Sequence, residues 1–420
     1  MAFQVLKGMK DVMPTESAKW QYVERLMREL CAKHGFCEVR TPVLEHTELF
    51  LRGVGSTTDI VQKEMYTFTD KGDRSVTLKP EGTAGVVRAF VESGLAGGAL
   101  PVKMFYLNAP IFRYERPQAG RLREHHQFGV EMFGAKNAAA DAECIALVFD
   151  LLSRLGVTGL SANINSIGCK ECRPKYSAAL REYLKDNLDN LCDTCKTRYE
   201  QNPLRILDCK EEKCKAICAG APKTIDCLCD ECKEHFESLK ACLDALHIPY
   251  TVNPMIVRGL DYYTKTVFEV VSDALGAQSA VCGGGRYDYL VEEVGGPSVP
   301  AVGFGMGMER LIIMLENMGI KLPEQKTPDV YIASMGDNAF MAAMKLAYTL
   351  RDEGIYAEFD HVGRSFKAQF KFADKVGARS VIVIGDSELE TGEYKLKNMR
   401  DGSELTFKAE NAADAVKSIL

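Results

Sequence analysis

Residues 112–131, FRYERPQAGRLREHHQFGVE, join two β-like runs through an arginine-rich loop. The pattern predicts a strand, a charged loop and a second strand. Guanidinium groups bind phosphate oxygens through paired hydrogen bonds, and an acid among them, such as Glu115, can orient an arginine or accept from an amino group. A solvated hairpin face explains any single arginine equally well. With support from other segments, the stretch predicts a hairpin that binds a nucleotide triphosphate.

Two segments further along the chain give this support. Residues 258–263 read RGLDYY, and a guanidinium close to two phenols would form a polar pocket for an amino acid. The alternative is aromatic packing on an edge strand. Residues 303–311 read GFGMGMERL, in which bare glycines let a strand run close to a flat ligand and Arg310 can stack on it or pair with it. A flexible turn is the alternative there, but it would not need the arginine.

Length, charge and composition limit the possible functions. The chain has 420 residues, 46% of them hydrophobic, which suits two or three domains because single cores rarely exceed about 250–300 residues. A net charge of −6 argues against general coating of nucleic acid, so any RNA contact must be local. The sequence has no membrane-length apolar run, no signal-peptide core and no phosphate-binding GxxxxGK[ST] loop. We expect a cytosolic protein, and ATP, if it is bound, must be bound in another way.

The order of predicted elements indicates the fold class. Helical periodicity appears at 17–34, 138–155 and 308–318, and the β-like runs between them have few crossover helices, which favours an antiparallel sheet. These runs lie at 65–69, 75–78, 102–108, 111–114, 127–133, 161–167, 267–271 and 299–304. After the linker 319–328 the pattern alternates β and α, as in a small α/β domain. We therefore predict an α+β core over 1–325, a Cys-rich helical insertion at 169–245 and an α/β domain over 326–420.

Eleven of the fifteen cysteines lie between Cys169 and Cys242. In a reducing compartment, clustered cysteines favour a metal over disulfides. The pairs Cys169/Cys172 and Cys192/Cys195 match a four-cysteine zinc pattern, and a second set could form another tetrahedral site: Cys209, Cys214, Cys229 and Cys232, with Cys218 and Cys227 as spare candidates. We predict structural Zn²⁺, because four thiolates leave no open position for catalysis. Reduced free cysteines in a helical insertion are the alternative.

From about Phe3 to its C-terminus the chain resembles the histidyl-tRNA synthetase family, which belongs to class II of the aminoacyl-tRNA synthetases. The motifs that carry this resemblance are KGMKDVMP at 7–14, RTP at 40–42, PEGT at 80–83, the segments around Arg113 and Arg310, RGLDYY at 258–263 and GGGRYD at 283–288. The last two are the most specific. The resemblance implies a class II catalytic domain, a C-terminal anticodon-binding domain and a homodimer formed through the segment around Pro42.

The resemblance also implies a function, in which L-histidine is activated by ATP to histidyl-adenylate and transferred to the 3′ end of histidine tRNA. Mg²⁺ is expected on the β and γ phosphates. The residues implied to bind histidine are Glu81, Thr83, Arg113, Gln127, Glu131, Arg258, Tyr262 and Tyr263. Those implied to bind ATP are Arg113, Glu115, Arg121, His125 and Arg310. Arg258 and Arg113 would be catalytic, because they stabilise charge at the α-phosphate.

Two regions are candidates for contact with tRNA. Basic residues recur every three or four positions at Arg364, Lys367, Lys371 and Lys375, which places them on one face of a helix. A solvated face is the commoner explanation of such a stripe, but the resemblance favours RNA binding by the first three. Arg116 and Gln118, in the loop of the arginine-rich hairpin, are expected at the acceptor stem, and the Cys-rich insertion is expected over the acceptor end.

One competing interpretation is a non-catalytic histidine-sensing paralogue, such as the regulatory subunit of ATP phosphoribosyltransferase. Such paralogues resemble the catalytic core but lack the anticodon-binding domain. This chain keeps that domain and all the arginines named above, so the enzyme is the favoured interpretation. A regulatory domain of a stress kinase would need kinase motifs, which the sequence lacks.

Overall fold

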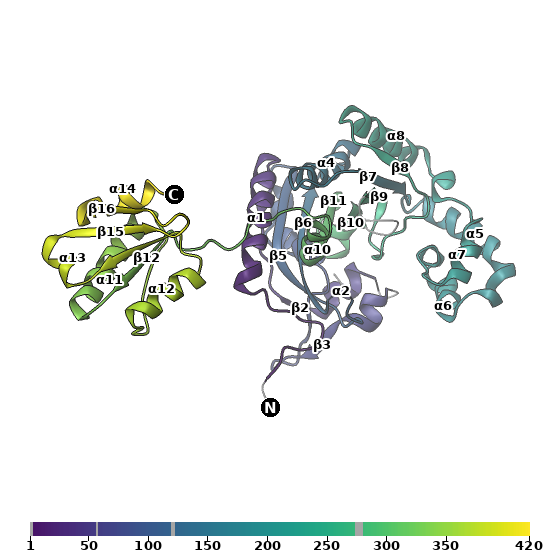
Figure 1. The fold of residues 1–420 in the computed structure, drawn as a ribbon. Helices are drawn as coiled ribbons and strands as arrows, with labels where there is room; N and C mark the ends of the chain where they lie inside the picture. Colours follow the sequence, from purple (N-terminus) through teal and green to yellow (C-terminus); the bar gives the residue numbers. More distant parts are fainter. Residues whose placement is uncertain (1–2, 56–57, 119–121, 274–279) are drawn as a thin grey trace. The chain divides into compact units, whose positions relative to one another are not determined.

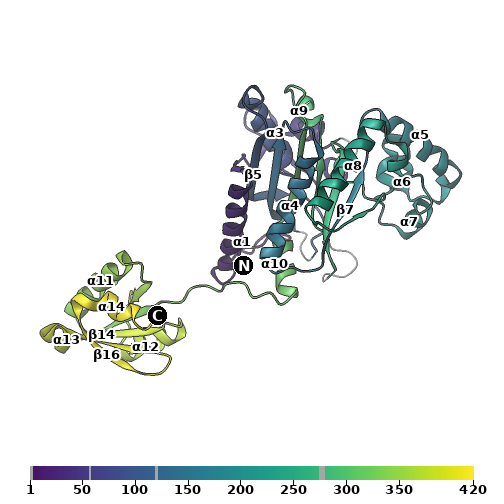
Figure 2. The same ribbon diagram turned by 90° about the horizontal axis from the view of Figure 1, so that it is seen from above.

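The computed structural model describes residues 3–55, 58–118, 122–273 and 280–420 (Figures 1 and 2). The chain divides into two compact units, Met1–Pro323 and Glu324–Leu420. Within the described residues, we find no helix whose length and apolar character would let it cross a membrane.

The first unit is built on an eight-stranded sheet in the order β1-β5-β6-β11-β10-β9-β7-β8. Its pairs are antiparallel except β1–β5 and β7–β8 at the two edges, which confirms the predicted antiparallel core. The strands are β1 (Cys37–Glu38), β5 (Val102–Phe112), β6 (Glu124–Phe133), β7 (Leu160–Ser166), β8 (Tyr250–Val252), β9 (Thr264–Ser272), β10 (Ala280–Arg286) and β11 (Ala301–Gly307).

Two details of this sheet differ from the sequence prediction. The runs 102–108 and 111–114 form the single strand β5, whose register shifts between Tyr106 and Ala109, where Asn108 has a φ of 53°. Strand β10 was missed, because the glycines at 283–285 have no side chains to give an alternating pattern. Pairing with β9 and β11 on its two sides holds this segment extended.

Three helices cover one face of the sheet: α1 (Pro14–Lys33), α4 (Ala138–Arg154) and α10 (Met308–Asn317) (Figure 2). Their apolar faces, including Met27 and Ile145, pack with Phe128, Phe268 and Phe304 of the strands in one buried cluster. The remaining core elements are α2 (Thr47–Gly53), α3 (Thr83–Glu92), α9 (Leu290–Glu293) and a small sheet of β2 (Leu44–His46), β3 (Tyr66–Thr69) and β4 (Ser75–Leu78).

The Cys-rich insertion between β7 and β8 is helical, as expected (Figure 1). Its helices are α5 (Cys172–Leu184), α6 (Asp193–Gln201), α7 (Glu212–Cys218) and α8 (Asp230–Ala245). Helix α8 buries Phe236, Leu239 and Leu243 in the same cluster as α4. The other three helices contribute buried residues, such as Leu180 and Cys195, to a second cluster that also contains Val257 of the core. The insertion is therefore part of the first unit.

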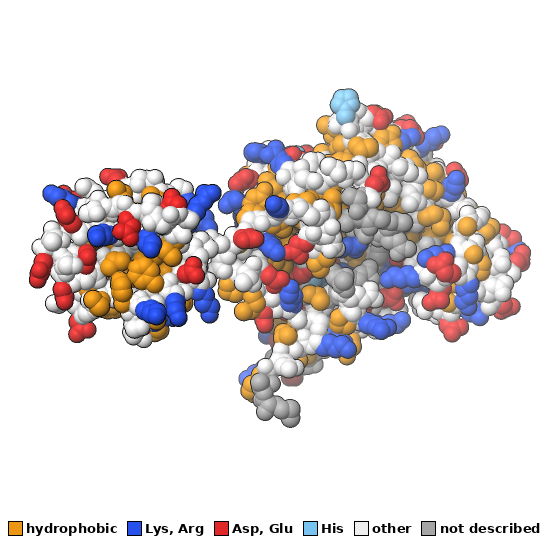
Figure 3. Space-filling model, viewed as in Figure 1, with side chains coloured by type: hydrophobic (Ala, Val, Ile, Leu, Met, Phe, Trp, Pro, Cys, Tyr) orange, Lys and Arg blue, Asp and Glu red, His pale blue; other side chains and the backbone are white. Residues whose placement is uncertain are grey.

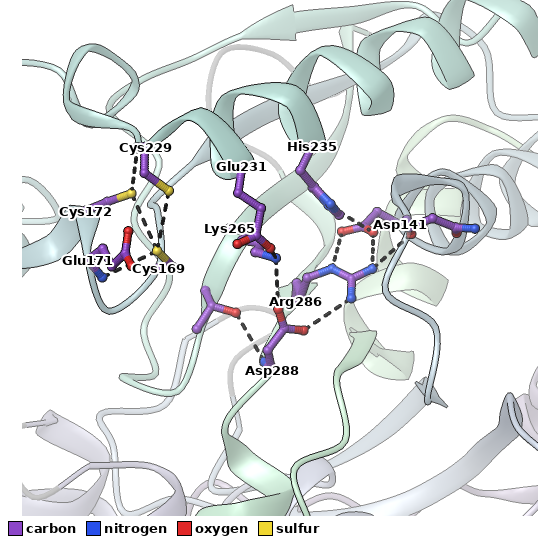
Figure 4. A network of polar contacts seen from close by, with 12 residues as sticks. Asp141, Cys169, Glu171, Cys172, Cys229, Glu231, His235, Lys265, Arg286 and Asp288 are labelled. Carbon is purple, nitrogen blue, oxygen red and sulfur yellow. Dashed lines mark hydrogen bonds and ion pairs between the residues drawn. The ribbon is translucent and has the colours of Figure 1, made fainter.

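A buried arginine joins the sheet to these helices (Figure 4). Arg286, at the end of β10, is fully buried and donates to Asp141 of α4 at 3.2 and 2.5 Å, and to Asp288 at 3.2 Å. It also donates to the carbonyls of Ala135 and Asn137. The guanidinium holds the pKa of Asp141 down at about 2 despite burial, so this carboxyl is charged in the folded state.

The second unit is an α/β domain with a mixed sheet in the order β13-β12-β14-β15-β16, as predicted. Three parallel strands, β12 (Val330–Ser334), β13 (Ala357–Phe359) and β14 (Ser380–Ile384), alternate with α11 (Asp337–Asp352) and α12 (Phe366–Lys375). The unit continues through α13 (Asp386–Thr391), the hairpin β15 (Glu393–Asn398) and β16 (Glu404–Lys408), and α14 (Ala412–Lys417). Gly402, in the turn of the hairpin, has a φ of 76°, a conformation that glycine adopts without strain.

Replacing Arg286 with methionine should lower the free energy of unfolding of the first unit by about 3–5 kcal/mol, because it leaves the Asp141 carboxylate buried without its partner. The only tryptophan, Trp20, is buried in this unit, so its fluorescence during urea unfolding reports the loss. Arg154→Met is the matched control, since Arg154 pairs with Asp150 on the surface and should contribute less than about 1 kcal/mol. Equal stabilities for the two variants would contradict the structural role of Arg286.

Candidate active site

Three glycines lie side by side across the centre of the large sheet. Gly129 of β6 is paired with Gly305 of β11, and Gly305 is paired with Gly283 of β10. Directly opposed residues of antiparallel strands face the same side, so these glycines form a bare strip of backbone. Tyr106 is opposite Gly129 and Glu269 is opposite Gly283, so larger side chains stand at both ends of the strip.

Neighbouring side chains use the space that these glycines leave. A Cβ atom on Gly283 would lie 2.3 Å from Nη2 of Arg258, and one on Gly305 would lie 2.5 Å from Nε2 of Gln127. On Gly129 it would lie 2.3 Å from the Tyr106 hydroxyl. Any side chain at these positions would displace a polar group, so the strip is the floor of a site.

A cavity of about 130 Å³ lies on this floor. Seven of the eight residues expected to bind histidine line it: Glu81, Thr83, Arg113, Gln127, Arg258, Tyr262 and Tyr263. They come from the start of α3, from β6, and from the segments before β6 and β9. The structure therefore brings together residues that are up to about 180 positions apart in the sequence, in a space that suits one small polar molecule.

The eighth residue, Glu131, lies next to the cavity wall and is fully buried. Its carboxylate accepts from the Thr83 hydroxyl at 2.7 Å and from the Tyr287 hydroxyl. Gly303 makes room for it, since a Cβ there would lie 2.0 Å from Oε2 of Glu131. Burial, with a smaller effect from Glu81, raises the pKa of Glu131 to about 8. Tyr287 belongs to the motif GGGRYD, but the sequence gives no signal for the role of its phenol.

Glu81 is held at the N-terminus of α3. Its carboxylate accepts from the backbone N–H groups of Thr83 at 2.8 Å and Ala84 at 2.6 Å, and from the Tyr262 hydroxyl at 3.4 Å. Burial raises the pKa of Glu81, while these N–H groups and Arg113 act in the opposite direction. The side chain is therefore fixed in place beside the cavity.

Arg258 reaches the cavity from the segment before β9. Its Nη1 donates to Glu269, which the sequence did not single out, and its backbone carbonyl accepts from Arg205 at 2.9 Å. Its Nε is buried and has no hydrogen-bond partner among the described residues. Buried polar groups are normally paired, so an unpaired guanidinium N–H beside a cavity is suited to an anionic ligand.

A second cavity, of about 260 Å³, shares Ile60, Arg113 and Gly259 with the first, so the two adjoin. Glu115 and His125, both expected to bind ATP, also line it. Burial, and then the nearby Arg113, lower the pKa of His125 to about 4. The imidazole is therefore neutral at pH 7, and its flat ring can stack on a base.

The other two residues expected to bind ATP are placed differently. Arg310 lies in the first turn of α10 and is not among the residues that line these two cavities. Arg121 lies outside the described residues. Beside Arg310, Glu309 accepts from the backbone N–H of His126 at 3.0 Å and lies 2.8 Å from its Nδ1, which joins α10 to β6. This contact was not foreseen, because its two residues are far apart in the sequence.

Part of the second cavity is lined by the Cys-rich insertion. Arg198, Arg205, Asp208 and Lys210 reach it from that segment, and Asp59 and Glu64 line it from the core. The sequence offered no signal for these residues, because nothing in the insertion marks which of its charged side chains face the core. Its charged residues belong to the site through tertiary contact alone.

The predicted grouping of the cysteines was wrong, although the same eight residues are involved. The first cysteine cluster consists of Cys169, Cys172, Cys229 and Cys232, and the second cysteine cluster consists of Cys192, Cys195, Cys209 and Cys214. In each cluster the sulfur atoms all lie within 4.8 Å of one another. The nineteen residues between Cys172 and Cys192 suggested that these two pairs share one site, but the insertion folds back so that each early pair meets a later pair.

Among the residues that the structure describes, only some of those predicted to contact tRNA are exposed and free of intramolecular ion pairs. Lys367 and Lys371 are exposed on α12, and Arg116 and Gln118 are exposed in the hairpin loop, next to residues 119–121, which lie outside the described residues. Arg364 does not belong to the helix, which begins at Phe366. Its guanidinium donates to Asp360 at 2.7 Å and lies 3.9 Å from the centre of the Phe372 ring, so intramolecular contacts hold it.

Comparison with known proteins agrees with this geometry. Residues 8–311 match the family model described as histidyl-tRNA synthetase, and residues 329–419 match the model described as anticodon binding domain. The chain is 58% identical to the histidine–tRNA ligase of Clostridium perfringens over 405 residues. These residues make up 96% of this chain and 96% of the relative. The chain is 57% identical to the histidine–tRNA ligase of Caldanaerobacter subterraneus over 98% of this chain and 99% of the relative.

A solved structure gives the same result. The apo histidyl-tRNA synthetase of S. aureus is 40% identical and superposes with a TM-score of 0.84 over 99% of this chain and 100% of that one. Sequence identity and structure therefore agree along the whole length. On these findings, the chain belongs to the histidyl-tRNA synthetase family.

Proposed function

We propose that the chain activates L-histidine with ATP to histidyl-adenylate and then transfers the histidyl group to the 3′ end of histidine tRNA. The observation that carries this proposal is the pair of adjoining cavities that meet at Arg113, one of about 130 Å³ and one of about 260 Å³. Full-length similarity to histidine–tRNA ligases, including the anticodon-binding domain, argues against a histidine-sensing paralogue.

The smaller cavity would bind histidine. Glu81 is suited to the α-amino group, with Thr83 and Gln127 beside it, while Glu131 and Tyr263 would recognise the imidazole and Tyr262 would complete the wall. A ligand without the imidazole N–H groups would leave these buried groups unpaired, which gives strong discrimination against apolar amino acids.

The larger cavity would bind ATP. His125 would stack on the adenine, Glu115 would accept from its amino group, and Arg113 would bind the α-phosphate. We also propose Arg121 and Arg310 as ligands of the triphosphate, the latter by movement of its long side chain. Mg²⁺, when bound with ATP, would neutralise charge on the β and γ phosphates.

Arg258 would stabilise the transition state of activation. The histidine carboxylate attacks the α-phosphorus, the bond to the bridging oxygen breaks, and pyrophosphate leaves. Arg258 and Arg113 would compensate the negative charge that grows on the α-phosphate oxygens, and their fixed positions avoid the cost of reorganising solvent. The terminal ribose hydroxyl of the tRNA then attacks the activated carbonyl, and AMP leaves.

The two cysteine clusters would each hold a structural Zn²⁺. Four thiolates at a Zn–S distance of about 2.3 Å form a tetrahedron with edges of about 3.8 Å. The structure has Sγ–Sγ distances of 3.7 Å for Cys169–Cys172 and 3.8 Å for Cys192–Cys209. Backbone N–H groups also point at sulfur atoms, from Cys192 to Cys214 and from Cys229 to Cys172, and hydrogen bonds of this kind orient the ligands of a metal.

Contacts with tRNA and a second subunit complete the proposal. Acidic and basic side chains are mixed over the visible face of both units (Figure 3), so local groups must make the RNA contacts. We assign Lys367 and Lys371, with Arg364 if it leaves Asp360, to the anticodon region, and Arg116 and Gln118 to the acceptor stem. A homodimer would form at the edge strand β1 and the adjacent Pro42.

Replacing Arg258 with alanine should lower histidine-dependent ATP–pyrophosphate exchange by on the order of 10²–10³-fold, since it removes a charged donor that acts at the α-phosphate. Arg154→Ala, on the outer surface of α4, should keep the wild-type rate. Absence of exchange in the folded wild-type protein would reject the proposed activity and favour a histidine-sensing protein. A fully active Arg258 variant would remove this arginine from the mechanism.

Replacing Glu131 with glutamine should alter how stability depends on pH. The pKa of Glu131 is raised by folding, so the folded state keeps a proton that the unfolded chain releases, and stability falls as pH rises from about 5 to 8. Relative to the variant, the wild type should lose up to about 1.4 kcal/mol per pH unit. Urea unfolding followed by Trp20 fluorescence at several pH values measures this. Parallel curves would show that Glu131 does not titrate in this range.

Protein purified without chelator should contain about two zinc ions per chain by elemental analysis after gel filtration. Cys232→Ser should remove about one of them, because it takes a ligand from the first cysteine cluster. Cys242→Ser, in α8 but outside both clusters, should keep both. If the wild-type protein contained no metal, the prediction would be wrong and these cysteines would be free thiols. If it contained iron, the clusters would bind iron and not zinc.

A further inference from the structure

The second cysteine cluster encloses the part of the insertion that touches the active site. Cys192 and Cys195 precede this part, and Cys209 and Cys214 close it. Between Cys195 and Cys209 lie Arg198, Arg205 and Asp208, and Lys210 follows Cys209 directly; all four line the larger cavity. A metal held by this cluster would therefore fix both ends of the segment 196–210.

This segment makes three contacts with the core around the site. Arg198 donates to Asp59 at 3.0 Å and, through its other terminal nitrogen, to the backbone carbonyl of Arg205 at 3.1 Å. Asn202 donates to Asp261 at 3.1 Å. Arg205 donates to the backbone carbonyl of Arg258 at 2.9 Å. These contacts reach both ends of the short segment 258–261.

Burial makes the contact from Arg205 stronger than a surface hydrogen bond. Arg205 is 6% exposed, and its Nε lies 3.8 Å from a carboxylate oxygen of Asp261. The neighbouring Leu204 and Ile206 are buried in the same apolar cluster as Ile256 and Val257. The backbone of Arg258 is thus held by an arginine of the insertion whose two chain neighbours are anchored in the same apolar cluster.

We propose that the second cysteine cluster, with its metal, holds Arg205 as a positioning residue for Arg258 and keeps the segment 196–210 as a wall of the nucleotide cavity. The inference rests on the proposed function. The first cysteine cluster serves a different purpose: it joins the two ends of the insertion beside the Glu231–Lys265 ion pair and the Arg286 network (Figure 4). The two clusters can therefore be separated by experiment.

Two variants test the proposal in the full-length protein. Arg205→Ala should lower kcat of histidine-dependent pyrophosphate exchange by about tenfold or more, leave the KM for histidine within about twofold and keep the metal content of the wild type. Cys209→Ser should lose about one zinc per chain and show the same fall in kcat. In both, amide hydrogen exchange should become faster across residues 256–263, which is a readout independent of activity.

Two matched controls separate this role from general damage to the insertion. Tyr176→Phe removes a hydroxyl of the insertion that also donates to a backbone carbonyl, that of Pro222 at 2.9 Å, which lies outside both segment 196–210 and segment 258–261. Cys242→Ser changes a thiol of α8 that belongs to neither cluster. Both should keep the wild-type kcat and hydrogen exchange at 256–263.

The outcomes are distinct. Wild-type kcat in Arg205→Ala, or in a Cys209→Ser protein that has lost its zinc, would overturn the inference and leave the proposed function intact. A fall in kcat that the two controls share would also overturn it, because the effect would then be general destabilisation. Wild-type protein that shows no exchange would reject the proposed function and the inference together.

Discussion

The active site depends on a steric constraint at the centre of the large sheet. Gly129, Gly305 and Gly283 lie in register on three neighbouring strands, and the side chains that would bind substrate fill the volume that a Cβ would need. Gln127 and Arg258 can lie against the sheet only because these positions are bare. The cost is weak packing at three central strand positions. Larger side chains at both ends of the strip, and the helices on the opposite face, offset it.

The buried ionisable residues Arg286 and Glu131 depend on the same part of the sheet. The motif GGGRYD at 283–288 begins in the floor of the site and ends in the core, where Arg286 is saturated by hydrogen bonds. Directly after Arg286, Tyr287 donates its hydroxyl to the Glu131 carboxylate. One short segment thus gives the site its open floor, the orientation of a buried carboxylate and the attachment of the sheet to α4. These roles need different residue types, which explains why the motif is so specific.

The insertion extends this arrangement beyond the core. Its apolar residues continue the cluster that contains Tyr262 and Tyr263, and its arginines reach the segment that carries Arg258. A small helical segment with many charged residues has little core of its own, and metal sites commonly compensate for this. Under our proposal, the metal of the second cysteine cluster stabilises the insertion and also serves catalysis, because the cluster holds Arg205, which positions Arg258.

The amino-acid sequence was enough to predict the fold class, the division into a core, a Cys-rich insertion and an α/β domain, and the residue types of the site. These are encoded locally, in periodicity and short motifs. Tertiary structure alone decided which cysteines meet, that Arg364 is held by Asp360, and that Arg205 of the insertion touches Arg258. It also decided the row of glycines, since register between strands is a long-range property. Contacts between distant segments depend on how the chain folds back, and no local pattern specifies that.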